Sequence, residues 1–166
     1  MADPFQGLID VVKRLRAPDG CPWDKEQTYK SLTPHIIEEA YELVEAMETE
    51  NYALLKEELG DVLLHVIMLS NMAEEKSQFS VQEVATSVTE KMIERHPHVF
   101  GDKKVNSVEE VWTTWESIKK DQEKNKKNKT MDSIPKHLPA LLQATKIQKR
   151  ASRLGFDWKE MDGPLD

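Results

Sequence analysis

Two pairs of acidic side chains have the spacing of one helical turn and could bind a cation. Glu39 and Glu42 form the pattern Glu-x-x-Glu, and Glu58 and Asp61 form the pattern Glu-x-x-Asp. Side chains three residues apart lie on one face of a helix. If the two helices pack antiparallel, the four carboxylates converge, and their mutual repulsion then requires a divalent cation. A set of oxygen ligands favours a hard ion, so the pattern predicts Mg²⁺, with Mn²⁺ as the alternative.

The second pair is the more informative, because it lies in an apolar stretch. Between Leu59 and Leu69 the expected helix is apolar on nearly every face, which is typical of a buried helix. Acids there are costly unless cations, hydrogen-bond donors or a metal ion compensate them. Glu39 and Glu42 only border an apolar stripe, and by themselves they are also consistent with surface charges paired with Lys or Arg. That stripe is expected to be core and consists of Ile36, Ile37, Ala40, Tyr41, Leu43, Val44 and Met47.

His65 lies on the same stripe as Glu58 and Asp61 when the helix turns by about 100° per residue. A ferritin-like di-iron site would need Glu-x-x-His on two helices, and the spacing here does not fit that pattern. His65 is therefore interpreted either as a partner of the ligands or as a histidine of the core.

The elements that position these acids are expected to be helices. Thr33 followed by Pro34 is typical of a helix start, and Ser107 with Glu110 fits a capping box. No stretch alternates apolar and polar residues for long enough to be a strand. The expected fold class is therefore all-α, a helix bundle. The expected helices cover residues 7–16, 34–49, 52–75, 80–95, 108–120 and 140–154, with a loop at 17–24.

Composition excludes several classes of protein. The chain has 166 residues and a net charge of −7, a poor match to a general binder of nucleic-acid backbones. A membrane-spanning helix needs about 20 apolar residues, and the sequence has no such run. The single cysteine, Cys21, excludes an internal disulfide and a multi-cysteine zinc site. The start MADPFQGLID does not look like a secretory signal, so the expected compartment is the cytoplasm.

Charge patterning suggests three segments. Residues 1–118 are strongly acidic and form the expected helical module that carries both acidic pairs. Residues 119–133 begin with KKDQEKNKKNKT, which has six lysines and two acids and is interpreted as a charged linker or a frayed helix end. Residues 134–166 are expected to hold a C-terminal helix and a tail.

Several short segments occur in a specific order and spacing. They are GCPWD (20–24) with Gln27-Thr28, EEAYELVEA (38–46), EELGDVLLHV (57–66), KMIERHPHVFGD (91–102) and WESIK (115–119). Together they strongly resemble the MazG family of nucleoside triphosphate pyrophosphohydrolases. The resemblance covers about residues 8–158, and the tail is similar to the part that leads into a second helical module in two-module members.

The resemblance implies an α-helical bundle that works as a dimer or higher oligomer. It implies Mg²⁺-dependent hydrolysis of nucleoside triphosphates to monophosphate and pyrophosphate, with house-cleaning of non-canonical nucleotides as a further expectation. It also implies that the same four acids are the metal ligands. Glu38, next to them in sequence, is the candidate for orienting or deprotonating the attacking water, although it also fits a solvent-exposed position.

Basic and aromatic residues supply the expected substrate contacts. Lys91 and Arg95, spaced by one helical turn and followed by His96, match the stretch of the family that faces the triphosphate. Without the family they also fit an exposed basic patch. Trp115 matches the base-side tryptophan of the family, and Trp23 is a second candidate for stacking on the base.

Two other functions remain open. The chain could be a non-catalytic dimerisation or regulatory module of a two-module enzyme, although such a module need not keep buried acids. A nucleic-acid role for the lysine-rich segment would require salt-dependent DNA binding and is the least expected function.

Overall fold

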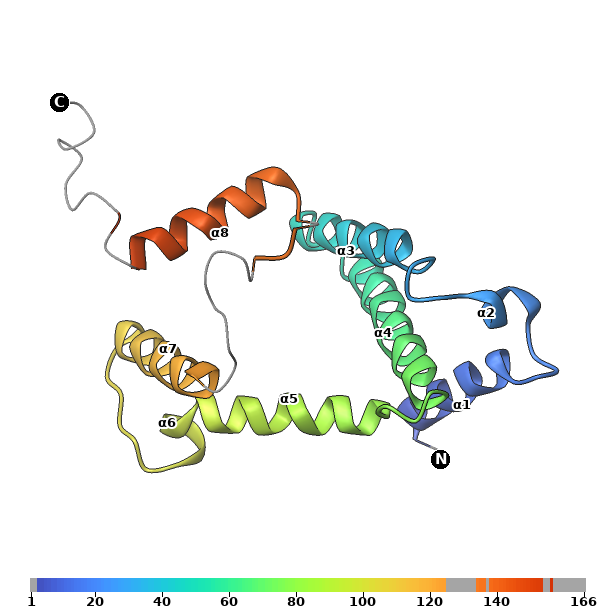
Figure 1. Ribbon diagram of the computed structural model, residues 1–166, viewed down its shortest axis with the longest axis horizontal. Helices are drawn as coiled ribbons and strands as arrows, with labels where there is room; N and C mark the ends of the chain where they lie inside the picture. Colours follow the sequence, from blue (N-terminus) through green and yellow to red (C-terminus); the bar gives the residue numbers. More distant parts are fainter. Residues whose placement is uncertain (1–2, 125–133, 137, 154–155, 157–166) are drawn as a thin grey trace. The chain divides into compact units, whose positions relative to one another are not determined.

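Every regular element in the described part of the chain is a helix (Figure 1). The computed structural model describes residues 3–124, 134–136, 138–153 and 156. The expectation of an all-α fold is therefore confirmed for these residues. The helices are α1 (Pro4–Arg16), α2 (Pro22–Glu26), α3 (Thr33–Glu48), α4 (Tyr52–Glu74), α5 (Val81–Arg95), α6 (Pro97–Phe100), α7 (Val108–Lys124) and α8 (Ala140–Arg153).

The six expected helices are all present, and their ends differ by a few residues. The short helices α2 and α6 were not predicted, and α2 replaces part of the expected loop at 17–24. Helix α7 continues to Lys124, so the first residues of the lysine-rich segment are helical. The rest of that segment, up to 133, and the expected helix end at Leu154 lie outside the described residues.

At two of the expected helix starts, the hydrogen bonds differ from those that the sequence predicted. Thr33 does not cap α3, because its hydroxyl donates to the Tyr29 carbonyl oxygen at 3.0 Å and Leu32 holds the N-cap position. At α7 the Ser107 hydroxyl accepts from the Glu110 N–H at 3.2 Å, as a capping box requires. The Glu110 carboxylate accepts from the Asn106 N–H instead of that of Ser107, at 2.8 Å.

The chain divides into two compact units, residues 1–92 and 93–166. The first unit has a small apolar core, because α1 and α3 both pack against α4. Leu8, Ile36, Leu63, Leu64 and Leu69 pack around this core. Its buried residues are Ile9, Val12, Leu32, Ile67, Met68, Met72 and Val81.

Helices α3 and α4 form a tight hairpin, and this hairpin carries both acidic pairs. The connection is only three residues long and includes Glu50, whose φ of 50° lies in the left-handed region. Asn51 caps α4 by accepting a hydrogen bond from the Leu54 N–H at 3.2 Å. The short connection and the cap return α4 along α3, so that side chains of the two helices meet.

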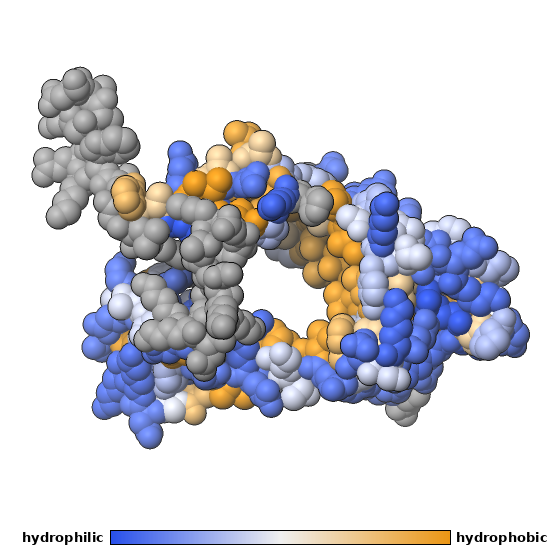
Figure 2. Space-filling model, in the orientation of Figure 1, coloured by the Kyte–Doolittle hydropathy of each residue, from blue (hydrophilic) through white to orange (hydrophobic). Residues whose placement is uncertain are grey.

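The predicted core stripe of α3 is largely wrong for the described residues. Ile37, Tyr41, Val44 and Met47 are each between 46% and 61% exposed, and Leu59 on α4 is 52% exposed. Figure 2 shows apolar side chains at the surface along the hairpin. The helical wheel identified an apolar face correctly. However, no described residue of this unit packs over the exposed side chains of that face.

Candidate active site

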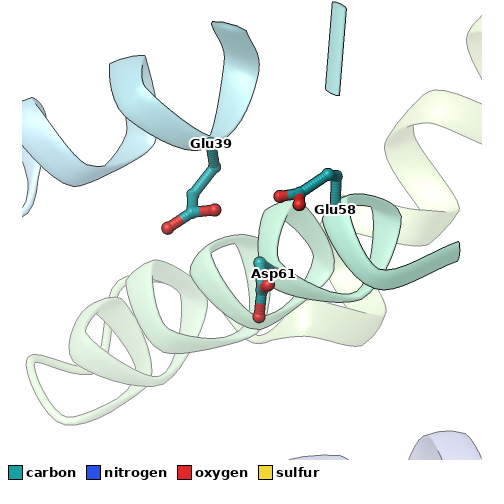
Figure 3. A group of neighbouring side chains, drawn as sticks. All are labelled: Glu39, Glu58 and Asp61. Carbon is teal, nitrogen blue, oxygen red and sulfur yellow. The ribbon is translucent and has the colours of Figure 1, made fainter. Parts of the chain in front are cut away.

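Three carboxylates from two helices meet on the hairpin. Glu39 of α3 reaches toward Glu58 and Asp61 of α4, as Figure 3 shows. One oxygen of each side chain lies within 4.8 Å of one oxygen of each of the other two. The sequence pattern predicted this convergence, and the structure brings these three of the four predicted ligands together.

Glu58 is the most constrained member of this carboxylate cluster. The residue is only 5% exposed, and its Oε2 has no hydrogen-bond partner among the described residues. Burial raises the pKa of the Glu58 carboxyl above its ordinary value of 4.5, and the charges of Glu42, Glu39 and Asp61 raise it further. An ionised Glu58 is therefore uncompensated among the described residues.

No lysine or arginine neutralises this cluster within the part of the chain that the structure describes. Among the described residues, no ion pair includes Glu58 or Asp61, and the only ion-pair partner of Glu39 is His65. A buried carboxylate oxygen without a donor and a converging set of oxygen atoms fit a divalent cation. Glu39, Glu58 and Asp61 are the residues that would hold it.

Glu42 and Glu38, the other acids predicted for the site, lie on exposed positions of α3. The Glu42 carboxylate is not part of the three-residue cluster, but it is close enough to raise the pKa of Glu58. Glu38 has a side chain that is 65% exposed and lies 4.0 Å from Nδ1 of His35. Their roles as ligand and as base stay predictions.

A row of rings connects the cluster to the segment that carries Trp23. Nε2 of His65 lies 3.9 Å from Oε1 of Glu39. The His65 ring stacks on that of His35, with centroids 6.4 Å apart and planes inclined by 17°. The Trp23 ring meets His35 edge-on at 6.1 Å and is about half exposed. The sequence placed His65 on the stripe of the ligands, but nothing in it indicated a role for His35.

The turn before Trp23 is held by close backbone packing and one arginine. A Cβ on Gly20 would lie 2.2 Å from the Leu15 carbonyl oxygen, so only glycine fits there. The Cys21 N–H donates to the same oxygen at 2.8 Å. Arg16 donates to the carbonyl oxygen of Asp24, which fixes α2 against the end of α1. These contacts explain physically why the GCPWD segment positions Trp23.

In the second unit, three of the predicted substrate residues contact one another. The Arg95 guanidinium lies over the Trp115 ring, 5.2 Å from its centroid. The His96 ring meets Trp115 edge-on at 4.9 Å and lies 5.6 Å from the ring of His98. Trp112, one turn before Trp115, is 62% exposed. The group combines a cation with aromatic faces, which suits a ligand that has both phosphates and a base.

Lys91, the remaining predicted substrate residue, is exposed on α5. It lines a shallow surface hollow with apolar neighbours such as Phe79, Val84 and Val88. Neither this position nor the contacts of Arg95, His96 and Trp115 test substrate binding. All four assignments therefore stay predictions, as does that of Trp23.

Comparison with known proteins gives a consistent result. Residues 27–100 match the model of the MazG nucleotide pyrophosphohydrolase domain. The chain is 44% identical over 159 residues to the nucleoside triphosphate pyrophosphohydrolase/pyrophosphatase MazG of Thermotoga maritima, which covers 96% of this chain and 61% of that protein. It is 41% identical over 160 residues to the nucleoside triphosphate pyrophosphohydrolase of Escherichia coli K12, which covers 95% of this chain and 60% of that protein.

A solved structure is also similar. The crystal structure of a mazG-related protein from Thermotoga maritima aligns with a TM-score of 0.59 and 27% identity, covering 69% of this chain and 98% of that chain. The fold and the carboxylate pairs thus define an all-α protein with an acidic helix hairpin. The chain is thus similar to MazG proteins over most of its length, as its motifs predicted. It spans about 60% of the length of the curated relatives named above.

A membrane-spanning segment would have to be long and apolar. Among the described residues, no helix meets both requirements.

Proposed function

We propose that this chain hydrolyses nucleoside triphosphates to a nucleoside monophosphate and pyrophosphate in a Mg²⁺-dependent reaction, with Mn²⁺ as a substitute. The observation that carries the proposal is the buried Glu58 carboxylate, which faces Glu39 and Asp61 and whose Oε2 has no hydrogen-bond partner among the described residues, in a chain whose residues 27–100 match the MazG domain model. Three acids alone would repel a triphosphate, so a cation is needed before any substrate can approach.

The acids have separate proposed roles. Glu39, Glu58 and Asp61 hold the cation, and Glu42 joins them as the fourth ligand. A bound divalent ion neutralises phosphate charge and makes water more acidic. Glu38 orients or deprotonates the attacking water, whose oxygen forms a bond to the α-phosphorus. The bond from the α-phosphorus to the bridging oxygen breaks, and pyrophosphate leaves with that oxygen.

Substrate contacts come from the basic and aromatic residues that the sequence singled out. Lys91, Arg95 and His96 bind phosphate oxygens, since cations compensate the charge of the leaving pyrophosphate. Trp115 and Trp23 stack on the base, which suits a site that accepts several bases because every base has a flat face. A house-cleaning role on non-canonical nucleotides belongs to the same proposal.

The exposed apolar face of the hairpin supports assembly into a homodimer or higher oligomer. Large apolar side chains such as Tyr41 and Met47 are about 60% exposed there, and contiguous apolar surface of this kind marks interfaces. Light scattering coupled to size-exclusion chromatography tests this. Tyr41→Lys should shift the molecule to monomer, whereas Glu48→Lys, an exposed change on the same helix, should not. An unchanged mass in Tyr41→Lys would argue against this interface.

The activity is tested by measuring pyrophosphate release from canonical and modified nucleoside triphosphates, with Mg²⁺ or with EDTA. Glu58→Gln should lower turnover at least about 100-fold, because it removes one charged ligand and keeps the shape. Glu74→Gln, which changes an exposed acid on the same helix, is the matched control and should keep its turnover. Undiminished turnover in Glu58→Gln would refute the proposal.

The non-catalytic dimerisation module remains the alternative. It predicts a folded dimer that releases no pyrophosphate from any nucleotide of the panel. The cost of keeping the Glu58 carboxylate buried without a partner favours the enzyme, because a purely structural module gains nothing from it.

A further inference from the structure

His65 lies beside the carboxylate cluster without being one of its members. Its side chain is 15% exposed and that of Glu39 is 20% exposed, with Nε2 and Oε1 3.9 Å apart. The three clustered oxygens lie within 4.8 Å of one another, and neither nitrogen of His65 belongs to that group. Its position therefore differs from that of a fourth ligand.

The two ring nitrogens of His65 have different surroundings. Nδ1 is buried and has no hydrogen-bond partner among the described residues, whereas Nε2 faces the Glu39 carboxylate. A neutral imidazole carries one proton, and the nitrogen that faces an acceptor is the favourable place for it. This tautomer directs an N–H toward Glu39, and a small movement of either side chain would close the gap to a hydrogen bond.

Glu39 needs such a restraint more than the other two acids. It is the only clustered acid contributed by α3, and the charges of Glu58 and Asp61 push its carboxylate away. Its side chain reaches the surface, so without a donor it can turn toward solvent. Among the described ion pairs, His65 is the only partner of Glu39.

His35 limits the movement of His65. The two rings are nearly parallel, at 17° and 6.4 Å between centroids, and Trp23 meets His35 edge-on. His35 lies on α3, one turn before Glu39, so the restraint on the His65 ring comes from the helix that carries the acid it restrains.

We propose that His65 is a positioning residue, which holds the Glu39 carboxylate toward Glu58 and Asp61 by its Nε2–H, with His35 supporting the ring. This inference rests on the proposed cation site. Outer partners of metal ligands change metal affinity by about 10-fold to 100-fold when they are removed. The role requires a hydrogen-bond donor at this place, which a packing role does not.

The test is to measure the binding of Mn²⁺ to the whole chain in the absence of nucleotide. Electron paramagnetic resonance of the free ion and calorimetry both give the dissociation constant. His65→Phe keeps a ring and removes the donor, and it should raise the dissociation constant about tenfold. His65→Gln restores an N–H donor and should return it to within about threefold of the original protein. His35→Ala should weaken binding by a smaller factor than His65→Phe, and His35→Phe should not. The melting temperature in EDTA checks that each variant is folded.

The outcomes separate this inference from the proposed function. Equal Mn²⁺ affinity in the original protein and His65→Phe overturns it, and so does a His65→Gln variant that binds as weakly as His65→Phe. A protein that binds no Mn²⁺ also overturns it, since there is then no cation to position ligands for. If the protein binds Mn²⁺ through Glu58 but hydrolyses no nucleotide, the proposed function fails and the role of His65 stands.

Discussion

Helix α4 carries two acidic pairs whose surroundings differ completely. Glu74, the last residue of α4, and Glu75, its C-cap, are each paired with a cation of α1. Lys13 lies 2.9 Å from Glu74, and Arg16 binds Glu75 through two nitrogens at 2.7 and 2.9 Å. Glu58, in the other half of the same helix, has no cationic partner in the described structure.

The pKa values of Glu75 and Glu58 are also shifted in opposite directions. The hydrogen bonds from Arg16 hold the pKa of Glu75 below its ordinary value of 4.5. Burial raises the pKa of Glu58, and neighbouring acids raise it further. Among the described residues, Glu74 and Glu75 are thus neutralised by cations, whereas Glu58 is left uncompensated. An acid that stays buried without an internal partner is suited to an external cation.

The largest effect that tests this contrast is stabilisation by the cation itself. A ligand that binds only the folded state adds about 2.7 kcal/mol at 100 times its dissociation constant. We expect MgCl2 to raise the melting temperature of the original protein by several degrees, relative to EDTA at matched ionic strength. Glu58→Gln should not show this rise, whereas Glu74→Gln should. An equal rise in Glu58→Gln would show that Mg²⁺ acts elsewhere on the chain.

A smaller effect is expected at the paired end of α4. The Arg16 side chain is 8% exposed and also donates to the Asp24 carbonyl oxygen, so its loss removes donors from both the Glu75 carboxylate and that carbonyl. Glu75 is 40% exposed, which weakens the ion pair. Arg16→Met should therefore lower the free energy of unfolding by about 1–2 kcal/mol in urea titrations at neutral pH.

The pH dependence and a matched variant check this second effect. Because the folded pKa of Glu75 is lowered, its contribution is present above 4.5 and is lost as the pH falls through the folded pKa. The difference between Arg16→Met and the original protein should shrink there. Arg14→Met removes an exposed pair with Asp19 and should change stability very little. Equal losses in the two variants would contradict the buried role of Arg16.

Much of this contrast could be predicted from local sequence pattern. Periodicity predicted the helices that carry the acids, and the position of Glu58 and Asp61 in an apolar stretch indicated buried acids that need a compensating cation, hydrogen-bond donor or metal ion. The helix starts predicted from Thr33 and Ser107 were less accurate, because the hydrogen bonds at the start of a helix depend on the preceding turn. The short helix at Pro22–Glu26 was missed, because five residues are too few to show a period.

Contacts between distant parts of the chain could not be predicted. Arg16 and Glu75 are 59 residues apart, and nothing in either neighbourhood identifies the other. The contact of His65 with Glu39 likewise depends on how α4 returns along α3. The exposed face of α3 shows a further limit, since a helical wheel identifies an apolar side but not what covers it. Tyr41 was expected in a core and is 61% exposed.

The smallest effect has the opposite sign to that of Arg16→Met. In EDTA at neutral pH, Glu58→Gln should be slightly more stable than the original protein, by about 1–3 °C in melting temperature. The reason is that a raised folded pKa makes an ionised carboxylate unfavourable in the folded state, and an amide avoids this cost.

A pH series in EDTA decides whether that cost comes from the Glu58 charge. With a raised folded pKa, the carboxyl favours folding below 4.5, and this advantage is lost as the pH rises through the folded value. The gain from Glu58→Gln should therefore appear above that pH and vanish below 4.5, while Glu75→Gln should be destabilising at neutral pH. If Glu58→Gln is instead less stable than the original protein in EDTA, Glu58 has a favourable partner inside the chain. The contrast between the two ends of α4 would then fail, because both acids would be structural.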